Sequence, residues 1–169
     1  MSLESIVIFT DGSSRGNPGP GGYAAVIVHN DKVTELGGRE EHTTNNRMEL
    51  MAAIKALSSL PNYQLPTTIH SDSGYVVDGI TKWIHGWQKK GWKTADKKPV
   101  LNRDLWEDLL RAARGKDIEW RRVGGHAGVA GNERCDEIAT SFADNHSPAL
   151  YSGLLPNYRI KNILNVSGR

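Results

Sequence analysis

Residues 6–11, Ile6-Val7-Ile8-Phe9-Thr10-Asp11, decide the fold class of this chain. The first four form a continuous apolar run rich in β-branched side chains, which is typical of a strand buried on both faces at the centre of a sheet. We expect this strand to end at Asp11. A carboxylate would then lie at the edge of a buried sheet, either as a turn residue or as part of a site.

The segments that follow predict helices packed on a mixed sheet. The glycine- and proline-rich residues 16–22 are typical of a loop, and apolar runs separated by turn residues mark the other elements. Strands are expected at 23–28, 32–39, 67–72 and 118–123, and helices at 47–60, 75–87, 104–114 and 133–143. This order, β-β-β-α-β-α-α-β-α, predicts one α/β domain with a five-stranded mixed sheet flanked by helices.

Short polar and small residues shape the helices. The side chains of residues 43–46 can cap the helix expected to start at Arg47, and Asn132 can cap the last helix. Alanines beside Glu49 would let the first helix approach the sheet closely, which would bring Glu49 near it. Gly79 weakens the helix expected at 75–87.

Composition is that of a soluble protein. No apolar run approaches the roughly 20 residues of a membrane-spanning helix. Residues 1–5 lack the basic and apolar regions of a secretory signal. The single cysteine, Cys135, cannot form an internal disulfide. We therefore expect a monomer in the reducing cytoplasm that binds no membrane.

The last 25 or so residues differ from the rest. We expect a folded domain at residues 1–144 and a C-terminal tail at 145–169, which has three basic residues and no acids. The tail either wraps over the core or forms a flexible terminus. The side chains that would make the contact are Leu150, Tyr151, Leu154 and Tyr158. The tail also offers a surface for a protein partner that the sequence does not identify.

Positive charge is concentrated between Lys82 and Lys98, although the net charge of the chain is only +2. This segment has six lysines against one acid, a local net charge of +5. The residues of interest are the tryptophans Trp83, Trp87 and Trp92 with Lys89 and Lys90. Lysines pair with phosphates and aromatic rings pack on sugars or bases, so the segment is a candidate nucleic-acid surface. The alternative is a solvated lysine face over core tryptophans.

Four acids are candidates for a metal site. Asp11 and Asp72 follow predicted strands, while Glu49 and Asp136 lie in the first turns of predicted helices. Parallel strands deliver their carboxyl ends to one edge of a sheet, so Asp11 and Asp72 would lie side by side there. Crowded carboxylates repel one another unless a cation neutralises them, and hard oxygen ligands suit Mg²⁺ or Mn²⁺. Each acid on its own would equally serve as a cap, a turn residue or a solvated charge.

Read together, several long segments resemble those of the bacterial type 1 ribonuclease H family. They are residues 9–23 (FTDGSSRGNPGPGGY), 43–53 (TTNNRMELMAA), 71–76 (SDSGYV), 125–137 (GHAGVAGNERCDE), 83–85 (WIH) and 92–100 (WKTADKKPV). The resemblance covers roughly residues 5–143, in order along the chain. The first four of these segments each embed one of the four acids.

The resemblance implies a ribonuclease H-like fold and hydrolysis of the RNA strand of RNA–DNA hybrids, with residues 1–144 as the catalytic domain. It implies that two divalent ions, Mg²⁺ or alternatively Mn²⁺, are held by Asp11, Glu49, Asp72 and Asp136. The products would carry a 5′-phosphate and a 3′-hydroxyl. It assigns His126, in a glycine-rich loop, either to proton transfer from water or to product release.

The resemblance also suggests how a hybrid is held. Backbone groups and short polar side chains can read the 2′-hydroxyls of a minor groove. Asn17, Thr44, Asn45 and Asn46 are the candidates for this contact, in addition to their roles in turns and caps. The segment that contains Trp83 and Lys89 is similar to the family's basic protrusion, which would grip the DNA strand.

One residue departs from the family pattern, and two rival functions remain. Gly74 stands where close bacterial relatives commonly carry a substrate-contacting glutamine, so that contact is not transferred to this chain. The first rival is a non-catalytic hybrid-binding module, which four acids beside a phosphate-binding surface disfavour. The second is another nuclease or integrase of the same superfamily, which would lack the tryptophan- and lysine-rich protrusion and the Gly125–Gly128 loop.

Overall fold

The computed structural model describes residues 5–61, 65–124 and 128–167. Their strands form one mixed six-stranded sheet of order β5-β4-β1-β2-β3-β6. Its strands are β1 (Ile6–Ser14), β2 (Gly19–His29), β3 (Lys32–Thr43), β4 (Thr67–Ser71), β5 (Ile118–Arg122) and β6 (Ser152–Leu154). Its helices are α1 (Asn45–Ser58), α2 (Gly74–Asp78), α3 (Ile84–Lys89), α4 (Arg103–Ala113) and α5 (Ala130–Ala143). Across these described ranges, none of the helices has the length and apolar character needed to cross a membrane.

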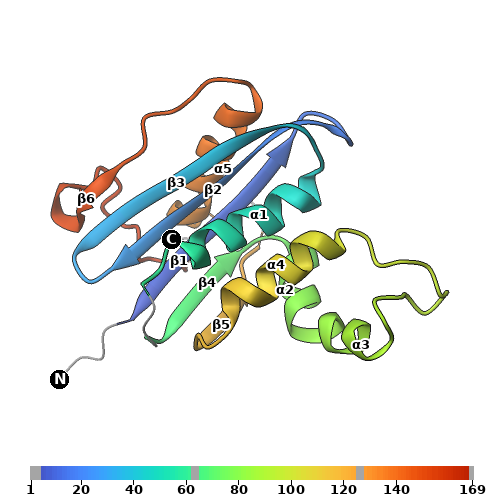
Figure 1. Ribbon diagram of the computed structural model, residues 1–169. Coiled ribbons are helices and arrows are strands. Elements are labelled where there is room, and N and C mark those ends of the chain that lie inside the picture. Colours follow the sequence, from blue (N-terminus) through green and yellow to red (C-terminus); the bar gives the residue numbers. More distant parts are fainter. Residues whose placement is uncertain (1–4, 62–64, 125–127, 168–169) are drawn as a thin grey trace.

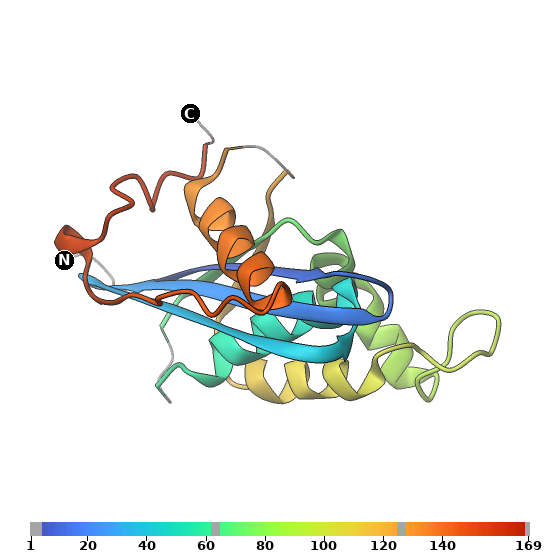
Figure 2. The same ribbon diagram turned by 90° about the horizontal axis from the view of Figure 1, so that it is seen from above.

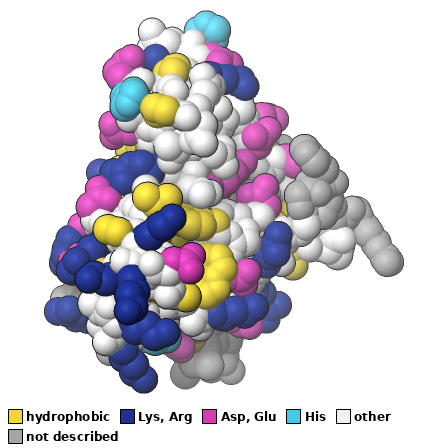
Figure 3. Space-filling view, turned by 90° about the vertical axis from the view of Figure 1, so that its right-hand side faces the viewer, with side chains coloured by type: hydrophobic (Ala, Val, Ile, Leu, Met, Phe, Trp, Pro, Cys, Tyr) yellow, Lys and Arg dark blue, Asp and Glu magenta, His cyan; other side chains and the backbone are white. Residues whose placement is uncertain are grey.

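The helices lie on the two faces of the sheet unequally. Helices α1 to α4 cover one face, with α4 packed on α1, while α5 covers the other (Figures 1 and 2). The loop between α3 and α4 projects away from the body of the molecule. Figure 3 views the side from which this loop projects and shows Lys and Arg side chains gathered around a patch of hydrophobic ones. The fold is thus the predicted α/β sheet flanked by helices, with one strand more than expected.

The central strand runs further than its apolar residues predict. β1 pairs in parallel with β4 from Ile6 to Thr10, but its antiparallel pairing with β2 continues to Ser14. The prediction that the strand ends at Asp11 was therefore wrong, as was the prediction of a loop throughout 16–22, because β2 already begins at Gly19. Pairing uses backbone groups, so polar and glycine residues extend both strands. Asp11 nevertheless lies where the parallel pairing with β4 stops.

A glycine lets the first helix approach the central strand. A methyl group at Gly12 would overlap the backbone of Met48 and Glu49, so α1 crosses β1 in direct backbone contact. Thr44 caps α1 as expected, since its hydroxyl accepts a hydrogen bond from the Arg47 N–H at 3.2 Å. The helix starts two residues earlier than predicted, at Asn45.

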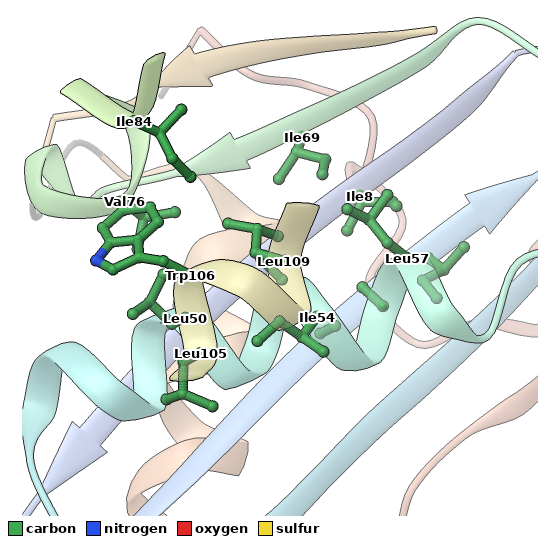
Figure 4. Packing of buried hydrophobic residues seen from close by; sticks show 14 of the residues in the cluster. Ile8, Leu50, Ile54, Leu57, Ile69, Val76, Ile84, Leu105, Trp106 and Leu109 are labelled. Carbon is green, nitrogen blue, oxygen red and sulfur yellow. The ribbon is translucent and has the colours of Figure 1, made fainter. Parts of the chain in front are cut away.

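A large apolar core fills the space between the sheet and α1 to α4. Figure 4 shows Ile8 and Ile69 of the sheet facing Leu50, Ile54 and Leu57 of α1, with Leu105, Trp106 and Leu109 of α4 beyond them. Trp106 is fully buried, and its ring lies where a side chain on Gly79 would be. The segment expected as one helix with a weak point at Gly79 is interrupted there by a π-helical turn, Gly79–Trp83.

The last helix also differs from its prediction. α5 begins at Ala130 rather than at residue 133, so Asn132 lies inside its first turn and is not its cap. The Asn132 side-chain amide instead donates to the backbone oxygens of Thr10 and His70, each at 3.3 Å. These two oxygens belong to β1 and β4, and a contact of this kind between distant segments leaves no local signal in the sequence.

The C-terminal tail packs on the core and supplies the sixth strand. β6 pairs antiparallel with Lys32–Thr34 at the outer end of β3. A 3-10 turn, Leu155–Asn157, follows and leads to Tyr158, which is 1% exposed. Of the tail residues predicted to make this contact, Tyr158 is buried and Tyr151 half-buried, whereas Leu150 and Leu154 are 39% and 48% exposed.

A buried carboxylate anchors the tail. Glu35 of β3 accepts hydrogen bonds from the Tyr158 hydroxyl at 2.6 Å, from the Tyr151 N–H at 2.9 Å and from Nε and Nη2 of Arg134 at 2.6 and 2.9 Å. Burial by itself would raise the pKa of Glu35, but these donors outweigh it and hold the pKa below the ordinary 4.5. The tail is thereby joined to both β3 and α5.

Replacing Tyr158 by Phe should lower the free energy of unfolding by about 1–2 kcal/mol, because one donor to a buried charge is lost. Since the depressed pKa of Glu35 contributes stability above about pH 4.5, the deficit should be full near neutral pH and shrink as the pH falls through the folded-state pKa. Denaturant titrations at several pH values measure it. Tyr151→Phe is the control, because its hydroxyl donates only to the exposed Leu154 carbonyl; equal losses in the two variants would contradict the prediction.

Candidate active site

Three acids from three elements meet at one point. Asp11 lies in β1, Glu49 in α1 and Asp72 directly after β4. One carboxylate oxygen from each lies within 4.8 Å of the others. Asp136 of α5 lines the same hollow of about 370 Å³ as Asp11 and Asp72. The structure therefore brings together the four acids singled out in the sequence, three of them in direct proximity.

This crowding opposes ionisation. Burial raises the pKa of Asp11 to about 7, and the nearby charges of Asp72 and Asp136 add to the effect, although the Gly12 N–H donates to Asp11 at 2.8 Å. Burial, and then Asp11 and Asp72, raise the pKa of Glu49 well above its ordinary value. A hydrogen bond between the two carboxyls favours a proton on Glu49. Without a cation, the cluster is partly protonated near neutral pH.

The cluster fits a divalent cation. The Glu49 Oε2 atom is buried and has no hydrogen-bond partner among the residues that the structure describes. A buried oxygen of this kind beside two further carboxylates is suited to a hard metal ion, which would neutralise the repulsion and supply the missing partner. Asp11, Glu49 and Asp72 are the residues placed to hold it.

Asn132 is a residue of the site that sequence patterning assigned to another role. Its amide joins the backbone at Thr10, directly before Asp11, to the backbone at His70, two residues before Asp72. It also lines the hollow that contains both aspartates. Asn132 thus joins β1 to β4 close to the two aspartates.

Other residues line the same hollow. Gly124 and Gly128 lie on its wall, and they flank the predicted catalytic residue His126, which falls outside the described residues. Glu133 and Glu137 also line it, and no sequence signal distinguished them from surface acids. Glu137 is paired with Arg134 at 3.0 Å and with Arg159 of the tail at 3.5 Å.

The predicted minor-groove contacts gather in a second hollow. Asn17, from the turn between β1 and β2, lines it together with Thr44, Asn45 and Asn46 at the start of α1. Leu101 and Asn102 complete the wall. Asn102 was not selected from the sequence; its left-handed backbone lies directly before α4, and its side chain donates to the Tyr75 hydroxyl at 3.0 Å.

The tryptophans of the protrusion form a stacked series that reaches from the core to the surface. Trp87 packs on the buried Trp106 and on Trp83 and Trp92, with ring centroids 5.5 to 6.3 Å apart. Trp83 is 40% exposed, whereas Trp87 and Trp92 are half-buried against the core. Lys89 and Lys90 are exposed. The segment is therefore both a core extension and a solvated basic surface.

The strand order, with carboxylates at the point where the parallel pairing of β1 with β4 stops, defines an α/β protein of the ribonuclease H-like class. Among solved structures, LC9-RNase H1, a type 1 RNase H, is similar with a TM-score of 0.79 and 27% sequence identity over 97% of this chain and 85% of the other. The arrangement of helices and sheet thus matches a known architecture.

Sequence comparison defines the family. The family model for RNase H matches residues 3–144. A ribonuclease H of Maricaulis maris is 56% identical over 81% of this chain and 92% of its own length, and one of Novosphingobium aromaticivorans is 54% identical over 83% and 98%. The chain belongs to the ribonuclease H family, as a bacterial type 1 enzyme.

Asp11→Asn should stabilise the metal-free protein at pH 8, by about 1–4 kcal/mol. Because the folded-state pKa of Asp11 is raised to about 7, the stability from its protonated form is present below the ordinary value of 3.8 and is lost as the pH rises through 7. Asparagine does not ionise and avoids this loss. Denaturation in chelator at pH 5 and pH 8 should show the gap widening with pH.

Asp104→Asn is the matched control, because Arg47 holds the pKa of Asp104 below its ordinary value and the sign reverses. Adding Mg²⁺ should stabilise the wild type by mass action and the Asp11→Asn variant much less. Equal free energies of unfolding for the wild type and Asp11→Asn at pH 8 in chelator would contradict the prediction that ionised Asp11 destabilises the metal-free fold.

Proposed function

We propose that this ribonuclease H is an endoribonuclease that hydrolyses the RNA strand of RNA–DNA hybrids by two-metal-ion catalysis, leaving 5′-phosphate and 3′-hydroxyl ends. The observation that carries the proposal is the meeting of Asp11, Glu49 and Asp72 within 4.8 Å, with Asp136 on the same hollow. Mg²⁺ is the expected metal, with Mn²⁺ as the alternative, because both prefer carboxylate oxygens.

The chain's own groups prepare the reaction. Two divalent ions bound at the acidic cluster would supply the activation of a water nucleophile and the stabilisation of the leaving oxygen. Asp11, Glu49, Asp72 and Asp136 would hold them, and metal binding would displace the protons that Asp11 and Glu49 carry near neutral pH. Asn132 keeps the two strand ends in register for this site. His126 is proposed to move a proton from water or to assist product release.

Two surfaces would orient the hybrid. The hollow lined by Asn17 and by the start of α1 offers amide and hydroxyl groups for the 2′-hydroxyls of the RNA strand. The protrusion around Trp83, Lys89 and Lys90 offers rings and cations for the DNA strand. Both contacts belong to the proposed catalytic domain, residues 1–144, while the expectations of a cytoplasmic monomer stay predictions.

A module that only binds hybrid explains the acidic cluster poorly. Burying Glu49 and Asp11 with raised pKa values costs folding free energy, and the charges repel phosphates. Neither cost serves binding, whereas both follow from a site that needs metal.

The activity is tested with end-labelled RNA–DNA hybrid, double-stranded RNA and double-stranded DNA, each with Mg²⁺ and with chelator. Only the RNA of the hybrid should be cut, and chelation or Asp11→Asn should lower the rate by at least about a thousandfold, because metal activation of water is lost. Product ends are read by enzymatic ligation and by phosphatase sensitivity. Cutting in chelator, or hybrid binding without cutting in either metal, would overturn the proposal.

Replacing Trp83, Lys89 and Lys90 by alanine should weaken hybrid binding, because two phosphate-pairing cations and a ring are lost. The slope of log K against log [salt] should become shallower by about 0.9 for each phosphate contact removed. Binding is measured in chelator over a range of salt concentrations. Lys116→Ala is a control, because Lys116 lies far along the chain from this segment and donates to the Ala112 carbonyl; an unchanged slope in the triple variant would count against the protrusion.

A further inference from the structure

A guanidinium occupies the space that a side chain at Gly74 would fill. A methyl group on Gly74 would lie 2.9 Å from Cζ of Arg122 and 3.0 Å from each of its terminal nitrogens. The backbone of Gly74 is not left-handed, so its conformation does not require glycine. The close approach of Arg122 is therefore the feature of this position that depends on glycine.

Strand alternation directs Arg122 toward α2. Ile118 and Trp120 of β5 pack on the core beneath α1 and α4, and Arg122, two residues on, shares their face of the sheet. Arg121 faces the opposite side and pairs with Glu119 at 3.0 Å. In the pairing of β4 with β5, Arg122 lies opposite Ser71, the residue directly before Asp72. The guanidinium is thus at the carboxyl end of the strand next to the acidic cluster.

The charge of Arg122 is not used within the part of the chain that the structure describes. Its side chain is exposed and makes no ion pair or hydrogen bond there. Arg122 therefore lies next to the end of β4 that precedes Asp72, at the start of the helical segment that leads to Trp83 and Lys89.

We propose that Arg122 binds a backbone phosphate of the hybrid beside the metal site, and that Gly74 provides the space for its guanidinium. This inference rests on the proposed hybrid-cleaving function. A guanidinium offers paired donors that match a phosphate, and it loses little when a phosphate replaces water. Arg122 would add a cation between the lysines of the protrusion and the acidic cluster. Its phosphate contact would hold the scissile strand next to the acids.

The first test is Arg122→Ala, with Arg121→Ala as the matched control from the same strand and the opposite face. Arg122→Ala should raise KM roughly tenfold at low salt with kcat unchanged, since one charge-assisted phosphate contact is lost. The salt slope of hybrid binding in chelator should become shallower by about 0.9. Arg121→Ala should change neither. Melting temperatures check that both variants are folded.

The second test is Gly74→Ala, which displaces the flexible end of Arg122 and suits a helix start. It should weaken binding like Arg122→Ala, and the double variant should lose no more than Arg122→Ala alone. Additive losses would overturn the role given to Gly74. If the wild type cuts hybrid but Arg122→Ala keeps its KM and salt slope, or if Arg121→Ala loses as much, the phosphate contact is wrong while the proposed function stands. A wild type that cuts no hybrid overturns the proposed function itself.

Discussion

The backbone contact between Gly12 of β1 and the start of α1 is the constraint on which the site depends. Because no side chain separates the strand from the helix there, Glu49 is brought against Asp11. Burial of the apolar faces of α1 and the sheet supplies the free energy that holds this close approach. The mutual repulsion of the buried acids opposes it and offsets part of that free energy. Packing therefore fixes the geometry of the acids before any metal arrives.

Because packing fixes the geometry of the acids, the surrounding residues serve to keep that geometry. The Asn132 amide donates hydrogen bonds to both β1 and β4 next to Asp11 and Asp72. These bonds oppose a separation of the two strands that would relieve the repulsion between the aspartates. The tryptophan series supports the proposed substrate surface in the same way, since Trp87 connects the exposed Trp83 to the buried Trp106. Under the proposed function, a site held in this way would be preorganised for the charge that develops as the phosphodiester bond is cut.

The sequence predicts five of the six strands, the fold class and the candidate acids, because these depend on local patterns such as the apolar run before Asp11. It does not predict where β1 ends and β2 begins, because glycine and serine residues pair through their backbones as well as β-branched ones do. Nor does it predict contacts between distant segments. Asn132 reads as a cap but joins two strands, Arg122 reads as a surface charge but fills the space above Gly74, and Tyr158 finds Glu35 from 123 residues away.

The tail has a consequence for how the protein behaves among copies of itself. Open sheet edges invite pairing with strands of other molecules, and such pairing leads to aggregation. This sheet blunts its two edges differently: β5 carries Glu119, Arg121 and Arg122, while the outer end of β3 is covered by β6. The hydrogen bonds that Tyr151 and Tyr158 donate to Glu35 thus also keep β6 in place over the edge of β3. Resistance to aggregation would then depend on residues that lie outside the acidic cluster.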